Sequence, residues 1–267
     1  MDLGYDGSTA AVTGGTKGMG RCIALCMAEE GAKVAVLARN RSELDETVEA
    51  LLAAGAPDAL GLETDVTNNA QVHDAFAAIG ARWGSLNALV NTVGPGAGRF
   101  EDLSDDDWEA VLNLGFMSMV RCARAALPLL REAPWARIVN VSAHSIQRQS
   151  PLIVAYTAAK SALASVSKNL AKSLAPEGIL VNTVSPGTFV TASFSEGLRT
   201  TFEAEDLDPT NPVDVMTWID THFHQPADLG RAGLPEEIAA VVTFLASKRN
   251  SYTTGANVNV DGGSDFV

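Results

Sequence analysis

The chain has 267 residues, of which 46% are hydrophobic, enough for a large buried core. Its formal net charge at pH 7 is −13, so we expect neither a nucleic-acid partner nor an anionic membrane surface, because both require clustered cations. The chain has only 3 cysteines, no signal-peptide pattern near the N-terminus, and no apolar run that approaches the ~18 residues of a membrane span. These features predict a cytoplasmic protein without a disulfide framework.

Short apolar runs alternate with helical windows almost from end to end. Most runs are continuously apolar, as expected for parallel strands that are buried on both faces. The alternation predicts an α/β fold with a doubly wound parallel sheet, formed as one domain by residues 1–267. The predicted strands are Thr9–Thr13, Lys33–Ala38, Leu86–Thr92, Arg137–Ser142, Leu180–Val184 and Asn257–Val260, and the predicted helices are Met19–Glu30, Ser42–Ala53, Asn69–Arg82, Asp105–Leu130, Ala155–Ala175 and Pro235–Ala246.

A glycine-rich turn, Thr13–Gly20, follows the first predicted strand and opens the first helix. Glycines let a turn adopt positive φ and let the backbone approach a pyrophosphate, and a helix N-terminus offers free N–H groups. The spacing of Gly14, Gly18 and Gly20 is G-x-x-x-G-x-G, which differs from the general G-x-G-x-x-G fingerprint. Its place between a strand and a helix predicts that the turn binds dinucleotide phosphates.

The second predicted strand ends at Arg39 and Asn40 without an acidic residue. An acid at this point would bind the ribose 2′-hydroxyl of NAD, whereas an arginine accommodates the 2′-phosphate of NADP. Lys17, within the glycine turn, adds a second cation on the same side. Arg39 and Lys17 together predict NADP as the cofactor, with NADPH preferred over NADH.

Residues 188–229 break the alternation and contain three prolines and many acids. Such a stretch is too long for an ordinary connection, so it is either disordered or a lid over the substrate. Its apolar content favours the lid and suggests a fairly hydrophobic substrate, such as a 3-oxoacyl thioester, a steroid-like ring or an aromatic ketone. The large apolar residues concerned are Phe194, Phe202, Met216, Trp218 and Phe223.

His222 and His224 lie in the same segment, with Asp220 and Asp228 nearby. These are metal-ligand residue types, but their spacing matches no recognised metal motif. We therefore expect polar lid residues and no metal.

Further motifs stand in order along the chain: Asp65-Val66, Asn91-Thr92-Val93-Gly94, Asn113, Tyr156-Thr157-Ala158-Ala159-Lys160, Ser185–Thr191 and, in the tail, Arg231–Glu237 and Asp261-Gly262-Gly263. With the glycine turn they resemble the short-chain dehydrogenase/reductase family over essentially the whole chain, especially its 3-oxoacyl-reductase-like members. The resemblance implies a Rossmann-type sheet of about seven strands with a lid insertion, a nicotinamide cofactor, and a homotetramer or homodimer. The cofactor-binding residues that it implies are Gly14, Thr16, Lys17, Gly18, Met19, Gly20, Arg39, Asn40, Asp65, Val66, Asn91, Val93, Tyr156, Lys160, Pro186, Gly187, Phe189 and Thr191.

Tyr156 and Lys160 are four residues apart, so on a helix they share one face. A free phenol has a pKa of about 10, and a neighbouring ammonium lowers that pKa toward the range of a general acid/base. We therefore expect Tyr156 to transfer the proton to or from the substrate oxygen. The family resemblance further implies that Lys160 holds the nicotinamide ribose and that Asn113 anchors a water for proton relay.

One departure concerns the serine that usually stands thirteen positions before the tyrosine in the family, because this chain has Ala143 there. Side chains alternate along an extended segment, so Ser145 is expected to face the cleft as Ala143 does. Ser142 reaches the cleft only if the strand end bulges or the loop carries an insertion. Our first hypothesis is that Ser145 donates to the substrate oxygen, with Ser142 second.

These features together predict an NADP(H)-dependent oxidoreductase that reduces a ketone to a secondary alcohol or catalyses the reverse. One alternative is a non-redox lyase on the same scaffold, such as a halohydrin dehalogenase, but such relatives lack the lysine and the glycine motif. The other is a cofactor-sensing binding protein, which Ala143 keeps open and which the intact Asn113, Tyr156 and Lys160 disfavour.

Overall fold

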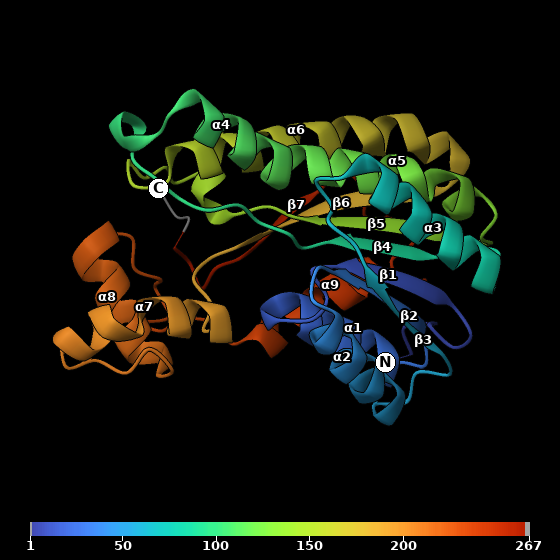
Figure 1. The fold of residues 1–267 in the computed structure, drawn as a ribbon, viewed down its shortest axis with the longest axis horizontal. Helices are drawn as coiled ribbons and strands as arrows, with labels where there is room; N and C mark the ends of the chain where they lie inside the picture. The colour runs from blue at the N-terminus through green and yellow to red at the C-terminus, as the bar shows by residue number, and fades with distance from the viewer. Residues whose placement is uncertain (1, 265–267) are drawn as a thin grey trace.

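The structure is a computed structural model that describes residues 2–264, and its centre is a seven-stranded sheet in the order β3-β2-β1-β4-β5-β6-β7 (Figure 1). All neighbouring strands pair in parallel, which confirms the predicted doubly wound sheet. The strands are β1 Thr9–Thr13, β2 Lys33–Ala38, β3 Ala59–Glu63, β4 Ala88–Asn91, β5 Ala136–Val141, β6 Ile179–Pro186 and β7 Asn257–Val260.

Most of the strands that were predicted from the sequence are the more buried ones. Every residue of β1, β4 and β5 is buried, so these strands are continuously apolar or nearly so. The pattern of runs missed β3, which pairs with β2 alone at the sheet edge and is only partly buried. Its sequence, ALGLE, lacks β-branched residues and therefore gives a weak strand signal.

Helices cover both faces of the sheet (Figure 1). On one face, α1, α2 and α9 pack around one apolar cluster, and on the other face α3, α5 and α6 pack around a second cluster. The helices are α1 Gly18–Glu29, α2 Arg41–Ala53, α3 Asn69–Trp83, α4 Asp105–Leu112, α5 Ser118–Arg131, α6 Val154–Leu174, α7 Ala192–Ala204, α8 Pro212–Phe223 and α9 Pro235–Leu245, and short 3₁₀ turns occur at Phe100–Asp102, His144–Ile146 and Ala175–Glu177.

The helix predicted for Asp105–Leu130 is divided by a π-helical turn, Asn113–Met117, into α4 and α5. By length and composition alone, Asp105–Arg131 is apolar enough to cross a membrane, which corrects our expectation that no segment approaches such a span. In this fold the helix is part of the core layer instead: α5 contacts α3, β4 and β5, and its residues Met119, Cys122 and Leu130 are buried.

Residues 188–229 are folded as α7 and α8, which lie apart from the sheet (Figure 1). They form their own apolar cluster, centred on the fully buried Phe202 and on Trp218. The amide of Val190 donates to the carbonyl of Gly233, and the amide of Gly233 donates to the carbonyl of Thr188, so both ends of the segment leave the body at one place. Of the two possibilities left open by the sequence, the structure therefore shows the folded one.

Candidate active site

A cavity of about 1240 Å³ lies at the carboxyl ends of the central strands. Parallel α/β sheets bind ligands at this edge, and the volume exceeds the 300–1,000 Å³ of a typical small-molecule pocket. Sixteen of the predicted residues line it, namely Gly14, Thr16, Lys17, Gly18, Met19, Gly20, Arg39, Asn40, Asp65, Val66, Val93, Ser142, Tyr156, Lys160, Pro186 and Thr191. The cavity therefore joins the predicted phosphate end to the predicted chemical end.

The glycine turn forms one wall of this cavity, and its backbone geometry disfavours a side chain at two of its glycines. Gly14 has φ +67°, a conformation that L side chains rarely adopt. A Cβ atom on Gly20 would lie 2.3 Å from the carbonyl oxygen of Gly14 and 2.8 Å from Oγ1 of Thr92. The turn can therefore bring its backbone and the N-terminus of α1 to the cavity only with glycine at these positions, as a dinucleotide-phosphate site requires.

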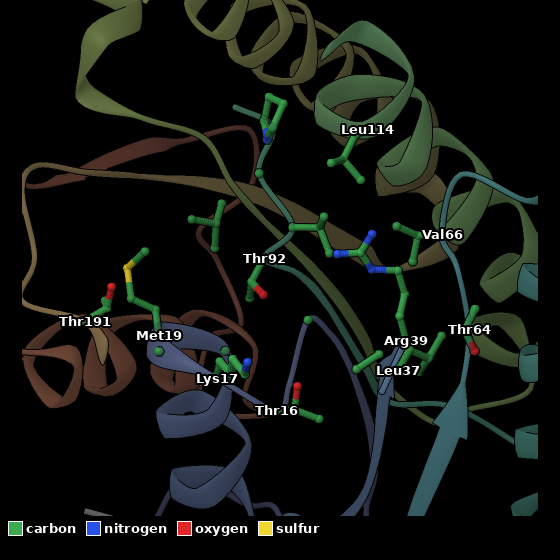
Figure 2. Close-up of a pocket in the computed structure, with 18 of the residues that line it drawn as sticks. Thr16, Lys17, Met19, Leu37, Arg39, Thr64, Val66, Thr92, Leu114 and Thr191 are labelled. Atoms are coloured by element: carbon green, nitrogen blue, oxygen red, sulfur yellow. The ribbon is translucent and has the colours of Figure 1, made fainter. Parts of the chain in front are cut away.

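At the end of β2, Arg39 is exposed and has no ion-pair partner among residues 2–264. Figure 2 shows its side chain crossing the pocket wall beside Val66. The carboxylate of Asp65 accepts hydrogen bonds from Oγ1 and the backbone N–H of Thr67, at 2.7 and 2.9 Å, which lower the pKa of Asp65. Arg39 thus offers a cation where the sequence predicted one, and its charge acts on Asp65 without forming an ion pair with it.

The second predicted cation, Lys17, is already paired. Its Nζ atom lies 2.8 Å from Oε1 of Glu43, a residue of the first turn of α2 that also lines the cavity. Oγ1 of Thr16 donates to the other oxygen of the same carboxylate at 3.2 Å. Glu43 was not predicted from the sequence, because the contact joins the glycine turn to a helix that begins more than twenty residues later.

At the other end of the cavity, α6 presents Tyr156 and Lys160 together, as their spacing predicted. The Nζ atom of Lys160 donates to the carbonyl oxygens of Val141, at 2.8 Å, and Val93, at 3.1 Å. Burial lowers the pKa of Lys160 to about 8 and raises the pKa of Tyr156 to about 12. This corrects the expected lowering of the tyrosine pKa, because desolvation of the phenolate dominates.

The structure separates the two candidate serines. Ser142 lines the cavity and its hydroxyl donates to the carbonyl of Lys160 at 3.0 Å. Ser145 is also buried but does not line the cavity, and its Oγ accepts from Oγ1 of Thr157 at 3.1 Å. The alternation argument fails because the backbone leaves the extended conformation after Ala143 and turns through the 3₁₀ segment His144–Ile146.

Asn113 lies at the start of the π-helical turn and does not line the cavity. Its Oδ1 accepts from Nη2 of Arg121 at 2.6 Å, and its carbonyl oxygen accepts from Nη1 of the same guanidinium at 3.5 Å. The next residue, Leu114, does line the cavity. The structure therefore places Asn113 beside Arg121 and next to a cavity-lining residue, and its water-anchoring role stays a prediction.

Three predicted cofactor residues do not line this cavity. Nδ2 of Asn91 donates to Oδ1 of Asn140 at 2.8 Å, the amide of Gly187 donates to the carbonyl of Val260 at 2.9 Å, and Phe189 is buried in the core. Eleven other residues line the cavity that the sequence did not assign to the cofactor site or the catalytic site, although Thr92 and Gly94 belong to one of the motifs and Phe194 to the predicted lid. They are Leu37, Ala38, Arg41, Glu43, Thr64, Thr92, Gly94, Pro95, Leu114, Val141 and Phe194.

His222 and His224, in the predicted lid, make local contacts. Nε2 of His222 lies 2.8 Å from Oε1 of Glu205, and Nδ1 of His224 lies 3.0 Å from the carbonyl of Asp220. Within residues 2–264, no three metal-ligating side chains are grouped in a way that could hold an ion.

Comparison with known proteins gives matches that span nearly the whole chain. The family model described as enoyl-(acyl carrier protein) reductase matches residues 14–265. The putative ketoacyl reductase of the monensin polyketide synthase from Streptomyces virginiae is 34% identical over 257 residues, 95% of each chain. The 3-oxoacyl-(acyl-carrier-protein) reductase of Aquifex aeolicus is 30% identical over 98% of this chain and 99% of its own. The crystal structure of L-sorbose reductase from Gluconobacter frateurii, complexed with NADPH and L-sorbose, has a TM-score of 0.93, with 27% identity and 100% coverage of both chains.

Proposed function

The chain belongs to the short-chain dehydrogenase/reductase family and is an NAD(P)-dependent oxidoreductase, and from this premise we propose that it reduces a ketone to a secondary alcohol with NADPH, or catalyses the reverse. The observation that carries the proposal is the placement of Tyr156 and Lys160 on one helix face, at the end of a cavity that extends to the glycine turn and Arg39. Among residues 2–264, no contact favours the lyase or the cofactor-sensing alternative.

The residues at the phosphate end fit a dinucleotide. Gly14 and Gly20 leave room for close backbone approach, and the N-terminus of α1 opens onto the cavity without a side-chain cap. The bound nicotinamide would supply hydride to the carbonyl carbon. Arg39 would face the 2′-phosphate, which supports NADP over NAD.

In reduction, the hydroxyl of Tyr156 donates its proton to the substrate oxygen. A pKa of about 12 keeps the phenol protonated at neutral pH, so it is ready to act as a proton donor. Lys160 is held by two main-chain carbonyls and lies beside the tyrosine, where its ammonium form would stabilise the phenolate that develops. Ser142, which faces the cavity, is placed to contact the substrate oxygen, and Ser145 is the second choice.

The apolar residues of the predicted lid say less about the substrate than the sequence suggested, because most of them do not line the cavity. Phe202, Met216 and Trp218 pack inside the lid, and of the large apolar residues named above only Phe194 lines the cavity. Leu114 and Pro95 also line the cavity, and these three apolar side chains support a fairly hydrophobic ketone. A panel of 3-oxoacyl thioesters, steroid-like ketones, aromatic ketones and, as the polar contrast, a ketose would test this part of the proposal.

We expect the enzyme to form a homodimer or homotetramer. The support is the set of partly exposed apolar residues on the outer helices, which include Val120 and Leu127 on α5 and Val166 and Leu170 on α6. Size-exclusion chromatography with light scattering measures the state directly, and a monomer at micromolar concentration would contradict this expectation.

The first experiment is a pair of titrations of the purified protein with NADPH and NADH, followed by fluorescence of the bound dihydronicotinamide. Tighter binding of NADPH, followed by ketone-dependent oxidation of it, would support the proposal. Tighter binding of NADH would contradict the assignment of Arg39. Binding of neither would overturn the proposed reaction.

A further inference from the structure

Glu43 places a carboxylate on the wall of the proposed NADP site. Its two oxygens contact Lys17, at 2.8 Å, and Thr16, at 3.2 Å, and all three residues line the cavity. Lys17 belongs to the glycine turn, whereas Glu43 belongs to the first turn of α2. The carboxylate thus connects the glycine turn to the helix that follows Arg39.

An acid in the first turn of a helix is common, because it stabilises the helix dipole. That explanation accounts for a carboxylate on α2 but does not explain why its side chain reaches the glycine turn. The start of α2 already has a cap, since Oδ1 of Asn40 accepts from the amides of Ser42 and Glu43 at 3.0 and 3.3 Å. The contacts of the Glu43 carboxylate are with the cofactor wall and not with the helix end.

The Glu43 carboxylate reduces the positive charge that is available to a 2′-phosphate in this cavity. A 2′-phosphate carries up to two negative charges, and of the two cations assigned to it only Arg39 is free, because the Lys17 ammonium is paired. A second carboxylate, that of Asp45, pairs with Arg41 at 3.0 Å, but both of those side chains are more than half exposed. Glu43 is the less exposed carboxylate, and the hydrogen bond from Lys17 lowers its pKa, so it remains charged at neutral pH.

We propose that Glu43 is a specificity-determining residue: it competes with the 2′-phosphate of NADP for Lys17 and so limits the preference of this enzyme for NADP over NAD. This inference rests on the proposed cofactor. NAD has a hydroxyl in place of the 2′-phosphate and does not compete for Lys17, so Glu43 affects the two cofactors differently. A purely structural role of Glu43 would change the affinity for both cofactors together.

The test is Glu43→Gln, because glutamine keeps the hydrogen-bond acceptor for Thr16 and removes only the charge. The matched control is Glu46→Gln, which removes the same charge from an exposed position on the same helix. We expect the ratio of the NADH to the NADPH dissociation constant to rise about three- to tenfold in Glu43→Gln, as for a partly exposed ion pair, and to stay unchanged in Glu46→Gln. The dissociation constant for NADH itself is expected to change little.

If Glu43→Gln alters the fold, the inference can still be tested by making the same substitution in a Lys17→Gln variant. In Lys17→Gln the competition is already absent, so adding Glu43→Gln should change the ratio much less than in the wild type. An unchanged ratio in Glu43→Gln, or an equal rise in both backgrounds, would overturn the inference while leaving NADP binding intact. A wild-type protein that binds neither cofactor would overturn the proposed function, and this inference with it.

Discussion

The Nζ atom of Lys160 lies 5.9 Å from the centroid of the Tyr156 ring, and the carbonyl oxygens of Val141 and Val93 hold it there. Val141 ends β5, and Val93 follows β4, so the sheet itself positions the lysine. The pair is therefore positioned by helix spacing on one side and by strand ends on the other.

Replacing Tyr156 with phenylalanine removes the proposed proton donor and little volume. We expect kcat to fall about 10²–10⁴-fold, while the dissociation constant of NADPH stays close to that of the wild type. Steady-state kinetics and cofactor titration measure the two effects separately. Tyr252→Phe is the matched control, because Tyr252 is 98% exposed. Equal activity of the two variants would remove Tyr156 from the mechanism.

The buried Lys160 predicts a pH dependence of stability. Its pKa is about 8 in the folded chain and returns to its usual 10.5 on unfolding, so the unfolded chain binds more protons between these values. The free energy of unfolding of the wild type, relative to Lys160→Met, should therefore rise from pH 8 toward pH 10, by at most about 1.4 kcal/mol per pH unit. Above pH 10 the raised pKa of Tyr156 lowers the free energy of unfolding of both proteins, because the unfolded chain loses that proton first, so this effect cancels in the difference. Urea unfolding at several pH values measures the difference, and a constant difference would show that the lysine pKa is not lowered.

The two serines should differ in their effect on turnover. Ser142→Ala is expected to lower kcat/KM about 10- to 100-fold, less than the loss of a dedicated oxyanion donor, because its proton is shared with the carbonyl of Lys160. Ser145→Ala should leave turnover nearly unchanged and cost about 1 kcal/mol of stability through its lost contact with Thr157. Kinetics and thermal unfolding of both variants distinguish the two roles. The opposite order would restore Ser145 as the group that contacts substrate.

Residues 188–229, the predicted lid, are joined near their C-terminal end to the loop after β5. Nη2 of Arg148 donates to the carbonyl of His224 at 3.2 Å, and Nη1 donates to the carbonyl of Ser264. Arg148→Met should loosen this attachment, raise KM for the ketone and speed proteolysis within 188–229, with little change in NADPH affinity. Arg199→Met is the control, because Arg199 makes only an exposed contact with Glu203 on α7. An unchanged KM and proteolysis rate would show that the lid does not depend on this contact.

Gly20 should tolerate no side chain. A Cβ atom there would lie 2.3 Å from a backbone oxygen, and we expect Gly20→Ala to weaken binding of NADPH and NADH alike, by about five- to a hundredfold. Gly197→Ala is the control, because among the described residues no heavy atom outside the neighbouring helix backbone lies within 4 Å of the position its Cβ would take. Cofactor titration of both variants measures the effect. Normal binding by Gly20→Ala would mean that the turn relaxes away from this contact.

The sequence was informative wherever chemistry depends on residues that are close along the chain. The glycine turn, the i and i+4 pair on α6 and the buried central strands all follow from local spacing, and the structure brings them to one cavity. The edge strand β3 was missed because partial burial weakens its pattern. Which serine faces the cavity depends on a 3₁₀ turn that begins one residue after Ala143, and no spacing rule encodes that turn.

The alternation of apolar runs and helical windows, the glycine spacing and helix periodicity by themselves predicted the fold class, the glycine turn before the first helix and the shared face of Tyr156 and Lys160, because backbone geometry relates such residues over a few positions. Only the tertiary structure decided that the lid aromatics pack against one another, that Lys17 is paired with Glu43, and that the pKa of Tyr156 is raised. These properties depend on which surfaces meet and how much water they exclude, and those are set by contacts between segments distant in sequence.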